Sequence, residues 1–198
     1  MLHRMGTPLL VIVAASFLTV MAQAADIAPA ANPQVVKPFT FFDEFTVGAF
    51  GHDSMRPTEG NTYDASFEVF TSPLFGNHNP TDVFGQLINP RLNLGVVIND
   101  DNRTSFAYLG PAWRVDLIGP VFADGEFGMA VNNGMINGDA THLAVGSNIT
   151  FHEEIGLGYR VTNNIDLILT AEHISHAGWF GKHNSGVSDL GVRIGYRF

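Results

Sequence analysis

The C-terminal segment of this 198-residue chain alternates strictly between apolar and other side chains. Apolar residues stand at every second position from Leu190 to Phe198, and only glycine and arginine fill the positions between them. Because successive side chains of a β-strand point to opposite faces, this segment would present one apolar face and one polar face. Such a strand is typical of a transmembrane β-barrel, whose outer face meets lipid while its inner face lines a polar lumen.

Both ends of the chain agree with that interpretation. The terminal Phe198, with Tyr196 two residues before it, resembles the C-terminal signature of bacterial outer-membrane proteins. At the other end, residues 1–24 combine the basic Arg4, an apolar run over residues 9–21 and the small-residue pattern Ala-Gln-Ala, which together predict a cleaved secretory signal peptide. The run is shorter than the roughly 20 residues that a spanning helix needs, so a membrane anchor is the weaker alternative.

The remainder divides into a leader and one barrel domain. Residues 25–38 are rich in Ala, Pro and Asn and are predicted to be an unstructured leader, and residues 39–198 are predicted to form the barrel. No helix is expected there, and Gly76–Asn89 and Asn133–Ala140 are predicted loops. The expected fold class is all-β, an eight-stranded antiparallel transmembrane β-barrel with both termini on the periplasmic side. The eight expected strands are Phe42–His52, Tyr63–Thr71, Arg91–Asn99, Thr104–Leu117, Val121–Asn132, Ser147–Val161, Ile165–His176 and Val187–Phe198.

Composition excludes several function classes. After residue 24 the chain holds nine Lys and Arg against 19 Asp and Glu, a formal charge of −10, so nucleic acid is not an expected partner. There is no cysteine, which rules out a disulfide framework and a thiolate metal site. No pair of histidines has the H-x-x-x-H spacing, and neither a metal nor another cofactor is expected.

The candidate chemistry lies at the end of the seventh expected strand. His173 and Ser175 are two residues apart, so on a strand they share one face, close enough for the imidazole to reach the hydroxyl. Counting back along the strand, they continue the apolar row that would face lipid, near the extracellular rim. A serine there could attack a lipid ester if the histidine removes its proton. The alternative is that both are polar interface residues with no chemistry.

The surrounding residues carry a family resemblance. The segment His173–Gly178, followed by Asn184-Ser185-Gly186 and the last strand, resembles the C-terminal signature of the outer-membrane lipid A 3-O-deacylases of the PagL type. The resemblance implies an eight-stranded barrel that hydrolyses the ester holding the 3-hydroxyacyl chain at the 3 position of lipid A. It also implies that Ser175 is the nucleophile and His173 the base.

The match departs from the family pattern at two positions. The family asparagine directly after the serine is His176 here, so its contribution to positioning or to the oxyanion must come from a different group. The acid expected near the start of the last strand falls on Ser188, and the neighbouring Asp189 has lumen parity, facing away from the pair.

A different carboxylate is a candidate for the third catalytic residue. If residues 162–164 form a tight turn, the strand register places Glu153 directly opposite His173 on the lipid face. A carboxylate there would hold the imidazole in its useful tautomer and favour the imidazolium. A rim glutamate that contacts only water or head groups is the alternative. For oxyanion binding or positioning, the candidates are backbone N–H groups around Gly178, the Asn184 side chain and His176.

The sequence therefore predicts an outer-membrane serine esterase that acts on lipid A, within the lipopolysaccharide of the outer leaflet. One alternative is a non-enzymatic small barrel of the adhesion or structural type, and another is an outer-membrane phospholipase, because the same two side chains would attack a glycerol ester. A soluble lipocalin-like barrel is disfavoured because the last three strands turn Asp, Glu and Arg inward. The orienting acid stays open between Glu153, Asp189 and none, and so does the oligomeric state.

Overall fold

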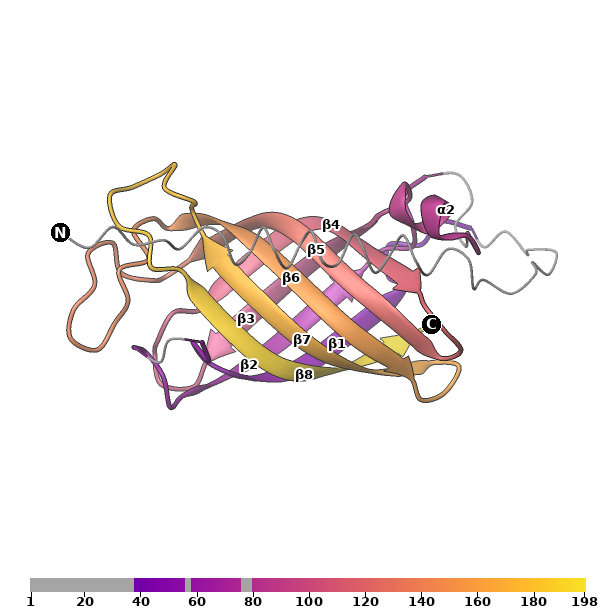
Figure 1. Ribbon diagram of the computed structural model, residues 1–198, viewed down its shortest axis with the longest axis horizontal. Coiled ribbons are helices and arrows are strands. Elements are labelled where there is room, and N and C mark those ends of the chain that lie inside the picture. The colour runs from indigo at the N-terminus through magenta and orange to yellow at the C-terminus, as the bar shows by residue number, and fades with distance from the viewer. Residues whose placement is uncertain (1–37, 56–57, 76–79) are drawn as a thin grey trace.

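Eight antiparallel strands, each hydrogen-bonded to the next, close into a barrel (Figure 1). The structure is a computed structural model that describes residues 38–55, 58–75 and 80–198. The predicted signal peptide and residues 25–37 of the predicted leader lie outside the described residues. Every expected strand is present, and no end differs from its expected position by more than two residues. The strands are β1 (Glu44–Gly51), β2 (Tyr63–Phe70), β3 (Arg91–Asn99), β4 (Phe106–Asp116), β5 (Val121–Asn132), β6 (Ile149–Arg160), β7 (Ile165–Ser175) and β8 (Val187–Arg197).

Closure is completed by the first and last strands. β1 pairs with β8 over its full length, from Glu44 opposite Arg197 to Gly51 opposite Leu190. The sheet therefore has no unpaired edge, which is the condition for strands to lie in lipid. We call the end that carries the C-terminus and the turns 117–120 and 161–164 the base, and the opposite end the rim (Figure 1).

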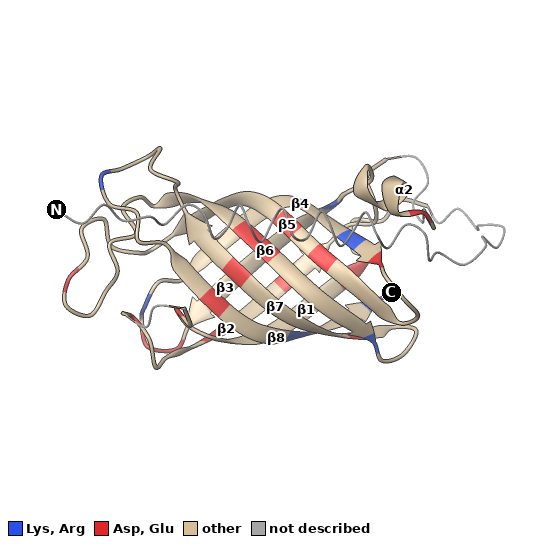
Figure 2. Ribbon diagram, in the orientation of Figure 1, with Lys and Arg blue, Asp and Glu red and all other residues tan. Residues whose placement is uncertain are grey.

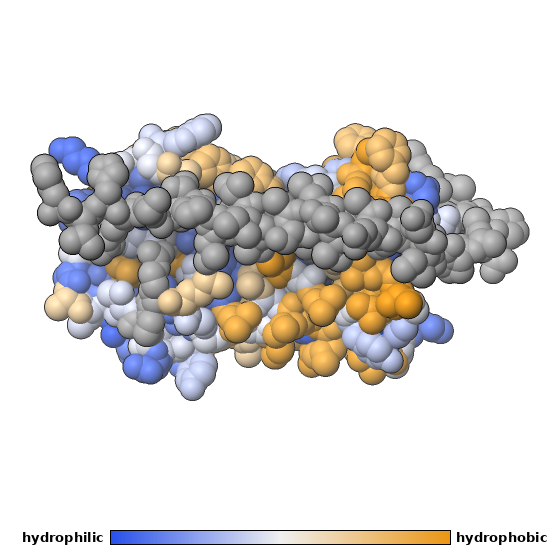
Figure 3. All heavy atoms as spheres, viewed as in Figure 1, coloured by the Kyte–Doolittle hydropathy of each residue, from blue (hydrophilic) through white to orange (hydrophobic). Residues whose placement is uncertain are grey.

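The two faces of the barrel differ as the alternation predicts. On β7, Leu167 and Leu169 are about half exposed on the outside, whereas Ile168 and Thr170 between them are fully buried. Apolar side chains accordingly gather on the visible outer surface of the strands (Figure 3). The outer face is thus suited to lipid on most of its strands.

No helix among the described residues is long and apolar enough to cross a membrane.

The lumen holds a central cluster of buried ionisable side chains, whose acidic members lie along the middle of the strands (Figure 2). Arg193 donates hydrogen bonds to both Glu68 and Glu154. The two ring nitrogens of His152 lie 3.2 Å from carboxylate oxygens of two further glutamates. This confirms that the last three strands turn charged side chains inward, as strand parity predicts. The central cluster consists of Glu68, Glu126, His152, Glu154, Glu172 and Arg193.

The lumen is narrow enough that some inward positions have no room for a side chain. A Cβ placed on Gly158 would lie 2.1 Å from a ring atom of Phe122, and one on Gly95 would lie 2.2 Å from the ring of Tyr108. Glycine at these two positions lets the large rings of the neighbouring strands fill the lumen.

The segment between β2 and β3 corrects one expectation. Within the predicted loop Gly76–Asn89, the helix α2 (Val83–Leu87) forms at the base. The Asp82 carboxylate caps it by accepting a hydrogen bond from the Gly85 N–H at 2.7 Å, and Val83 and Leu87 pack against the buried pair Val115 and Ala123. Five residues are too short to show a helical period in the sequence, so capping and packing decide this element.

At the rim, a buried hub joins three loops. Glu59 accepts hydrogen bonds from the backbone N–H groups of Thr104 and Leu143, at 3.0 and 2.7 Å, and lies 2.9 Å from His52 Nε2. Burial alone would raise the pKa of Glu59, but the hydrogen bonds with His52 and these two N–H groups lower it to about 2. The loop that contains Leu143 in turn reaches the loop after β7, because Ser185 N–H donates to the Ala144 carbonyl at 3.1 Å.

Candidate active site

The two residues predicted to carry the chemistry lie on the outer face of β7, next to the rim. His173 and Ser175 are both partly buried, and they alternate with the buried Glu172 and Ile174, whose side chains face the lumen. β7 has β6 on one side and β8 on the other (Figure 1). Residues of these two strands therefore form the walls of the site.

His173 stands between a carboxylate on one flank and a hydroxyl on the other. The register of β6 and β7 places Glu153 directly opposite His173, which confirms the predicted pairing. The register of β7 and β8 places Ser188 opposite the same histidine. His173 Nδ1 lies 2.7 Å from Ser188 Oγ, well within hydrogen-bond distance. Ser188 is the side chain at this site whose contact the sequence reasoning did not anticipate.

The Glu153 carboxylate retains free accepting capacity. Its Oε2 atom is buried and has no hydrogen-bond partner among the described residues. Directly opposed residues on antiparallel strands have Cβ atoms roughly 4.5–5.5 Å apart, so the Glu153 and His173 side chains leave the backbone side by side on the outer face. A negative charge at that place favours the charged form of the ring.

A loop glycine covers the imidazole. Gly186 has a φ of +65°, and a Cβ at this position would lie 2.6 Å from His173 Cε1 and 2.9 Å from Nε2. Glycine is required here because the left-handed backbone and the close approach both exclude a larger residue. The signal in the sequence was the Asn184-Ser185-Gly186 segment, although nothing local shows which ring the glycine meets.

His176 and Asn184 come together in the loop that follows β7. The backbone N–H of His176 donates to Asn184 Oδ1 at 3.0 Å, and its ring contacts the His183 carbonyl through Nε2 at 2.5 Å. The Phe180 N–H donates to the other ring nitrogen at 3.3 Å. His176 is fully buried, so it holds the shape of this loop from within.

Gly178 lies on the exposed turn of the same loop. Ala177 and Gly178 have φ values of +52° and +81°, and the Trp179 N–H closes the turn on the His176 carbonyl at 2.8 Å. This backbone turn begins at His176, directly after Ser175.

An aromatic wall flanks Ser175. Phe151, the cross-strand neighbour of Ser175 on β6, contacts the rings of Phe127, Trp179 and Phe180 with centroid distances of 5.7, 5.6 and 5.9 Å. Phe127, Trp179 and Phe180 are each exposed by about half or more. We call Phe127, Phe151, Trp179 and Phe180 the aromatic wall; it offers apolar surface beside the serine.

Asp189 lies on the other side of the sheet. It is buried in the lumen, where its Oδ1 atom accepts a hydrogen bond from the Asp53 N–H at 2.7 Å. This agrees with the lumen parity expected for it and places its carboxylate away from His173.

Two lumen groups have the spacing of metal ligands, but neither belongs to this site. Their possible ligand atoms lie within 4.8 Å of one another in each group. In both groups the histidine nitrogens already lie within hydrogen-bond distance of carboxylates, and the groups face the lumen rather than the outer surface. The groups are His52, Asp64 and Asp189, and His152, Glu154 and Glu172.

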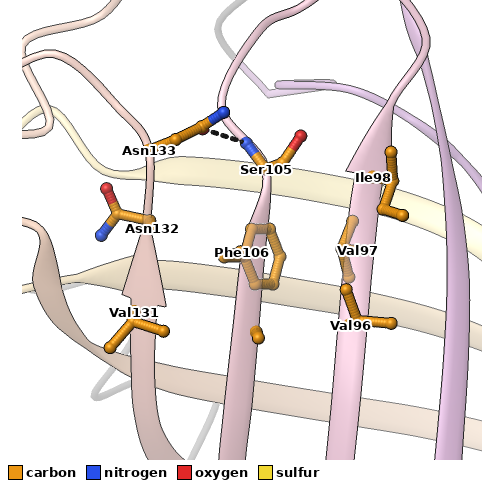
Figure 4. A pocket seen from close by; sticks show the side chains of 9 residues that line it. Val96, Val97, Ile98, Ser105, Phe106, Val131, Asn132 and Asn133 are labelled. Carbon is orange, nitrogen blue, oxygen red and sulfur yellow. Dashed lines mark hydrogen bonds between the residues drawn. The ribbon is translucent and has the colours of Figure 1, made fainter.

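A surface hollow lies elsewhere on the barrel. It is formed near the rim by β3, β4 and β5, and its upper part is closed by Asn133, which accepts a hydrogen bond from the Ser105 N–H at 2.7 Å (Figure 4). Its lining is mostly apolar and contains none of the predicted site residues. The predicted site residues Glu153, His173 and Ser175 lie instead on β6 and β7.

Comparison with the crystal structure of the outer membrane enzyme PagL supports the fold. The crystal structure of the outer membrane enzyme PagL matches with a TM-score of 0.58 and 13% identity, over 78% of this chain and 99% of that one. The structure of Neisserial surface protein A matches with a TM-score of 0.48 and 14% identity, over 82% of this chain and 100% of that one. At such identities the likeness concerns the fold alone. A search of curated proteins returned no match.

A family model matches the sequence over residues 91–197, more than half of the chain. The matched span contains Glu153, His173, Ser175 and Ser188. Its description is lipid A 3-O-deacylase (PagL). The chain therefore belongs to the PagL family of lipid A 3-O-deacylases, as a hydrolase of the bacterial outer membrane that deacylates lipid A.

Proposed function

We propose that Ser175 is the nucleophile and His173 the general base of this deacylation. The observation that carries the proposal is the row of Glu153, His173 and Ser188 across three strands on the outer face, with Ser175 next on the same face toward the rim. The reacting groups thus face the lipid rather than the lumen. A substrate in the same leaflet can reach them by moving sideways in the membrane.

The reaction proceeds in two balanced steps. Ser175 Oγ attacks the carbonyl carbon of the acyl ester at the 3 position while its proton passes to His173 Nε2, and a tetrahedral oxyanion forms. The carbon–oxygen bond to the sugar then breaks, and the imidazolium returns the proton to the leaving 3-hydroxyl. Water, deprotonated by the same imidazole, then attacks the carbonyl carbon of the acyl-serine. The bond from this carbon to Ser175 Oγ breaks, the imidazolium returns its proton to Oγ, and the 3-hydroxy fatty acid departs.

The remaining predicted residues act around these two. Glu153 is a positioning residue whose carboxylate stabilises the imidazolium that forms during each attack. The turn at Gly178 supplies backbone N–H groups for the oxyanion, a contribution that is typically about 2.7–4 kcal/mol per donor. His176 and Asn184 hold that turn through their mutual hydrogen bond. The aromatic wall receives acyl chain beside Ser175.

The test is made on lipid A in the membrane. We would express the mature chain, Ser175→Ala and the matched control Ser54→Ala, an exposed rim serine outside the site, and weigh the extracted lipid A by mass spectrometry. We expect one 3-hydroxyacyl chain to be lost with the native chain and with Ser54→Ala, and none with Ser175→Ala. Folding of each protein is checked by its migration in unheated detergent gels.

Other outcomes would select the alternatives. Loss of the acyl chain that persists in Ser175→Ala would overturn the role of this serine. Intact lipid A with free fatty acid released from glycerophospholipids would indicate a phospholipase, and unchanged lipids with folded protein would indicate a non-enzymatic barrel. A Glu153→Gln enzyme with full activity would remove Glu153 from the reaction.

A further inference from the structure

The Nδ1 atom of His173 already has a partner, and it is uncharged. Ser188 Oγ lies 2.7 Å from this nitrogen, across the pair of strands β7 and β8. A histidine that serves as a base must keep its proton on one ring nitrogen and present the lone pair of the other to the nucleophile. The group bound to Nδ1 decides which tautomer is present.

We propose that Ser188 is the positioning residue that sets the tautomer of His173. Its hydroxyl oxygen accepts the Nδ1–H, so Nε2 is left unprotonated and takes the proton of Ser175. The inference rests on the proposed roles of His173 and Ser175 and adds the group that prepares the base.

Ser188 and Glu153 have different roles toward His173. Nδ1 is directed toward β8, whereas Glu153 stands opposite His173 on β6, on the other flank of β7. The Glu153 Oε2 atom accepts no hydrogen bond from any described residue. Glu153 therefore supplies charge beside the ring, while the neutral hydroxyl supplies direction.

The surroundings hold this arrangement in place. Ser188 is 7% exposed and is the second residue of β8, so the strand pairing fixes its backbone opposite His173. Gly186 packs against the Cε1 and Nε2 side of the ring and limits its rotation. A hydroxyl also avoids placing a second carboxylate on the lipid-facing surface, where charge is unfavourable.

The direct test reads the tautomer without reference to activity. We would record nitrogen-15 NMR spectra of the His173 ring in the folded full-length barrel in micelles, for the native protein, Ser188→Ala and Ser188→Thr. We expect the proton on Nδ1 in the native protein and in Ser188→Thr, which keeps the hydroxyl, and a shift toward Nε2 in Ser188→Ala. An unchanged tautomer in Ser188→Ala would overturn the proposal.

The kinetic test uses lipid A in mixed micelles. Loss of one neutral hydrogen bond predicts a kcat lower by about 10-fold in Ser188→Ala, with KM little changed and with recovery in Ser188→Thr. Ser188→Asp should move the acid limb of the pH profile to higher pH, because a carboxylate favours the imidazolium. An unchanged kcat in Ser188→Ala would count against the proposal. A native protein without activity would instead refute the proposed function, and the NMR result would still decide the role of Ser188.

Discussion

Replacing one buried carboxylate should loosen the loops of the rim. In Glu59, the two carboxylate oxygens accept hydrogen bonds from the N–H groups of Thr104 and Leu143. Glu59→Gln removes the negative charge and replaces one of these oxygens by an NH₂ group, which would point its hydrogens at a backbone N–H. A carboxyl whose pKa falls from 4.5 to about 2 on folding stabilises the folded state by about 3 kcal/mol once it is ionised. That free energy is an upper value for what the substitution removes.

Amide hydrogen exchange in micelles measures the effect residue by residue. We expect the protection of the Thr104 and Leu143 amides to fall in Glu59→Gln near neutral pH, by up to about 100-fold, which corresponds to the upper value of about 3 kcal/mol of opening free energy. The mid-strand amide of Asp124 on β5 should keep its protection. Asp101→Asn, a carboxyl-to-amide change at an exposed rim position, is the matched control and should leave both loop amides unchanged.

The pH dependence has a definite sign. The pKa of Glu59 is lower in the folded than in the unfolded chain, so its stabilisation is complete above about pH 4.5 and is lost as the pH falls toward 2. Native protein should therefore lose protection at the two amides over that window, and Glu59→Gln should show no such change. Equal protection in the two proteins at neutral pH, with native spectra, would refute the role assigned to Glu59.

Three further changes test the interior. Burial alone would lower the pKa of His52, but hydrogen bonds with Asp64 and Glu59 raise it to about 10. The protonated His52 therefore stabilises the folded barrel fully below about pH 6.5, and this stabilisation declines as the pH rises through 10. Thermal unfolding across that range should show the decline in the native protein and not in His52→Gln. Arg193→Met leaves two buried glutamates unpaired and should lower the free energy of unfolding by about 3–5 kcal/mol in urea titrations, and an unchanged midpoint would contradict the pairing. Gly158→Val should prevent barrel formation, seen as loss of the compact form in unheated gels, whereas Leu157→Val on the outer face should fold.

The strands and one half of the site were predictable from local pattern. Period-two alternation is visible wherever one face meets lipid and the other meets a polar lumen, so all eight strands could be placed. The tight turn at 162–164 leaves one register for β6 and β7, because Val161 N–H bonds the Ile165 carbonyl at 2.8 Å. That register alone predicts that Glu153 and His173 are opposed.

The positions of Ser188 and Gly186 relative to His173 could not be predicted without the closed barrel. β8 follows a loop of 11 residues, 176–186, and a loop of that length does not determine which residue of β8 faces His173. The contact with Ser188, the placement of Gly186 over the ring and the hub around Glu59 all depend on strands and loops that are distant in sequence. Patterns within single strands and one short turn therefore predicted the barrel, its two faces and the shared outer face of His173 and Ser175. Tertiary structure decided the partner of Nδ1, because only closure of the sheet sets the register across a long loop.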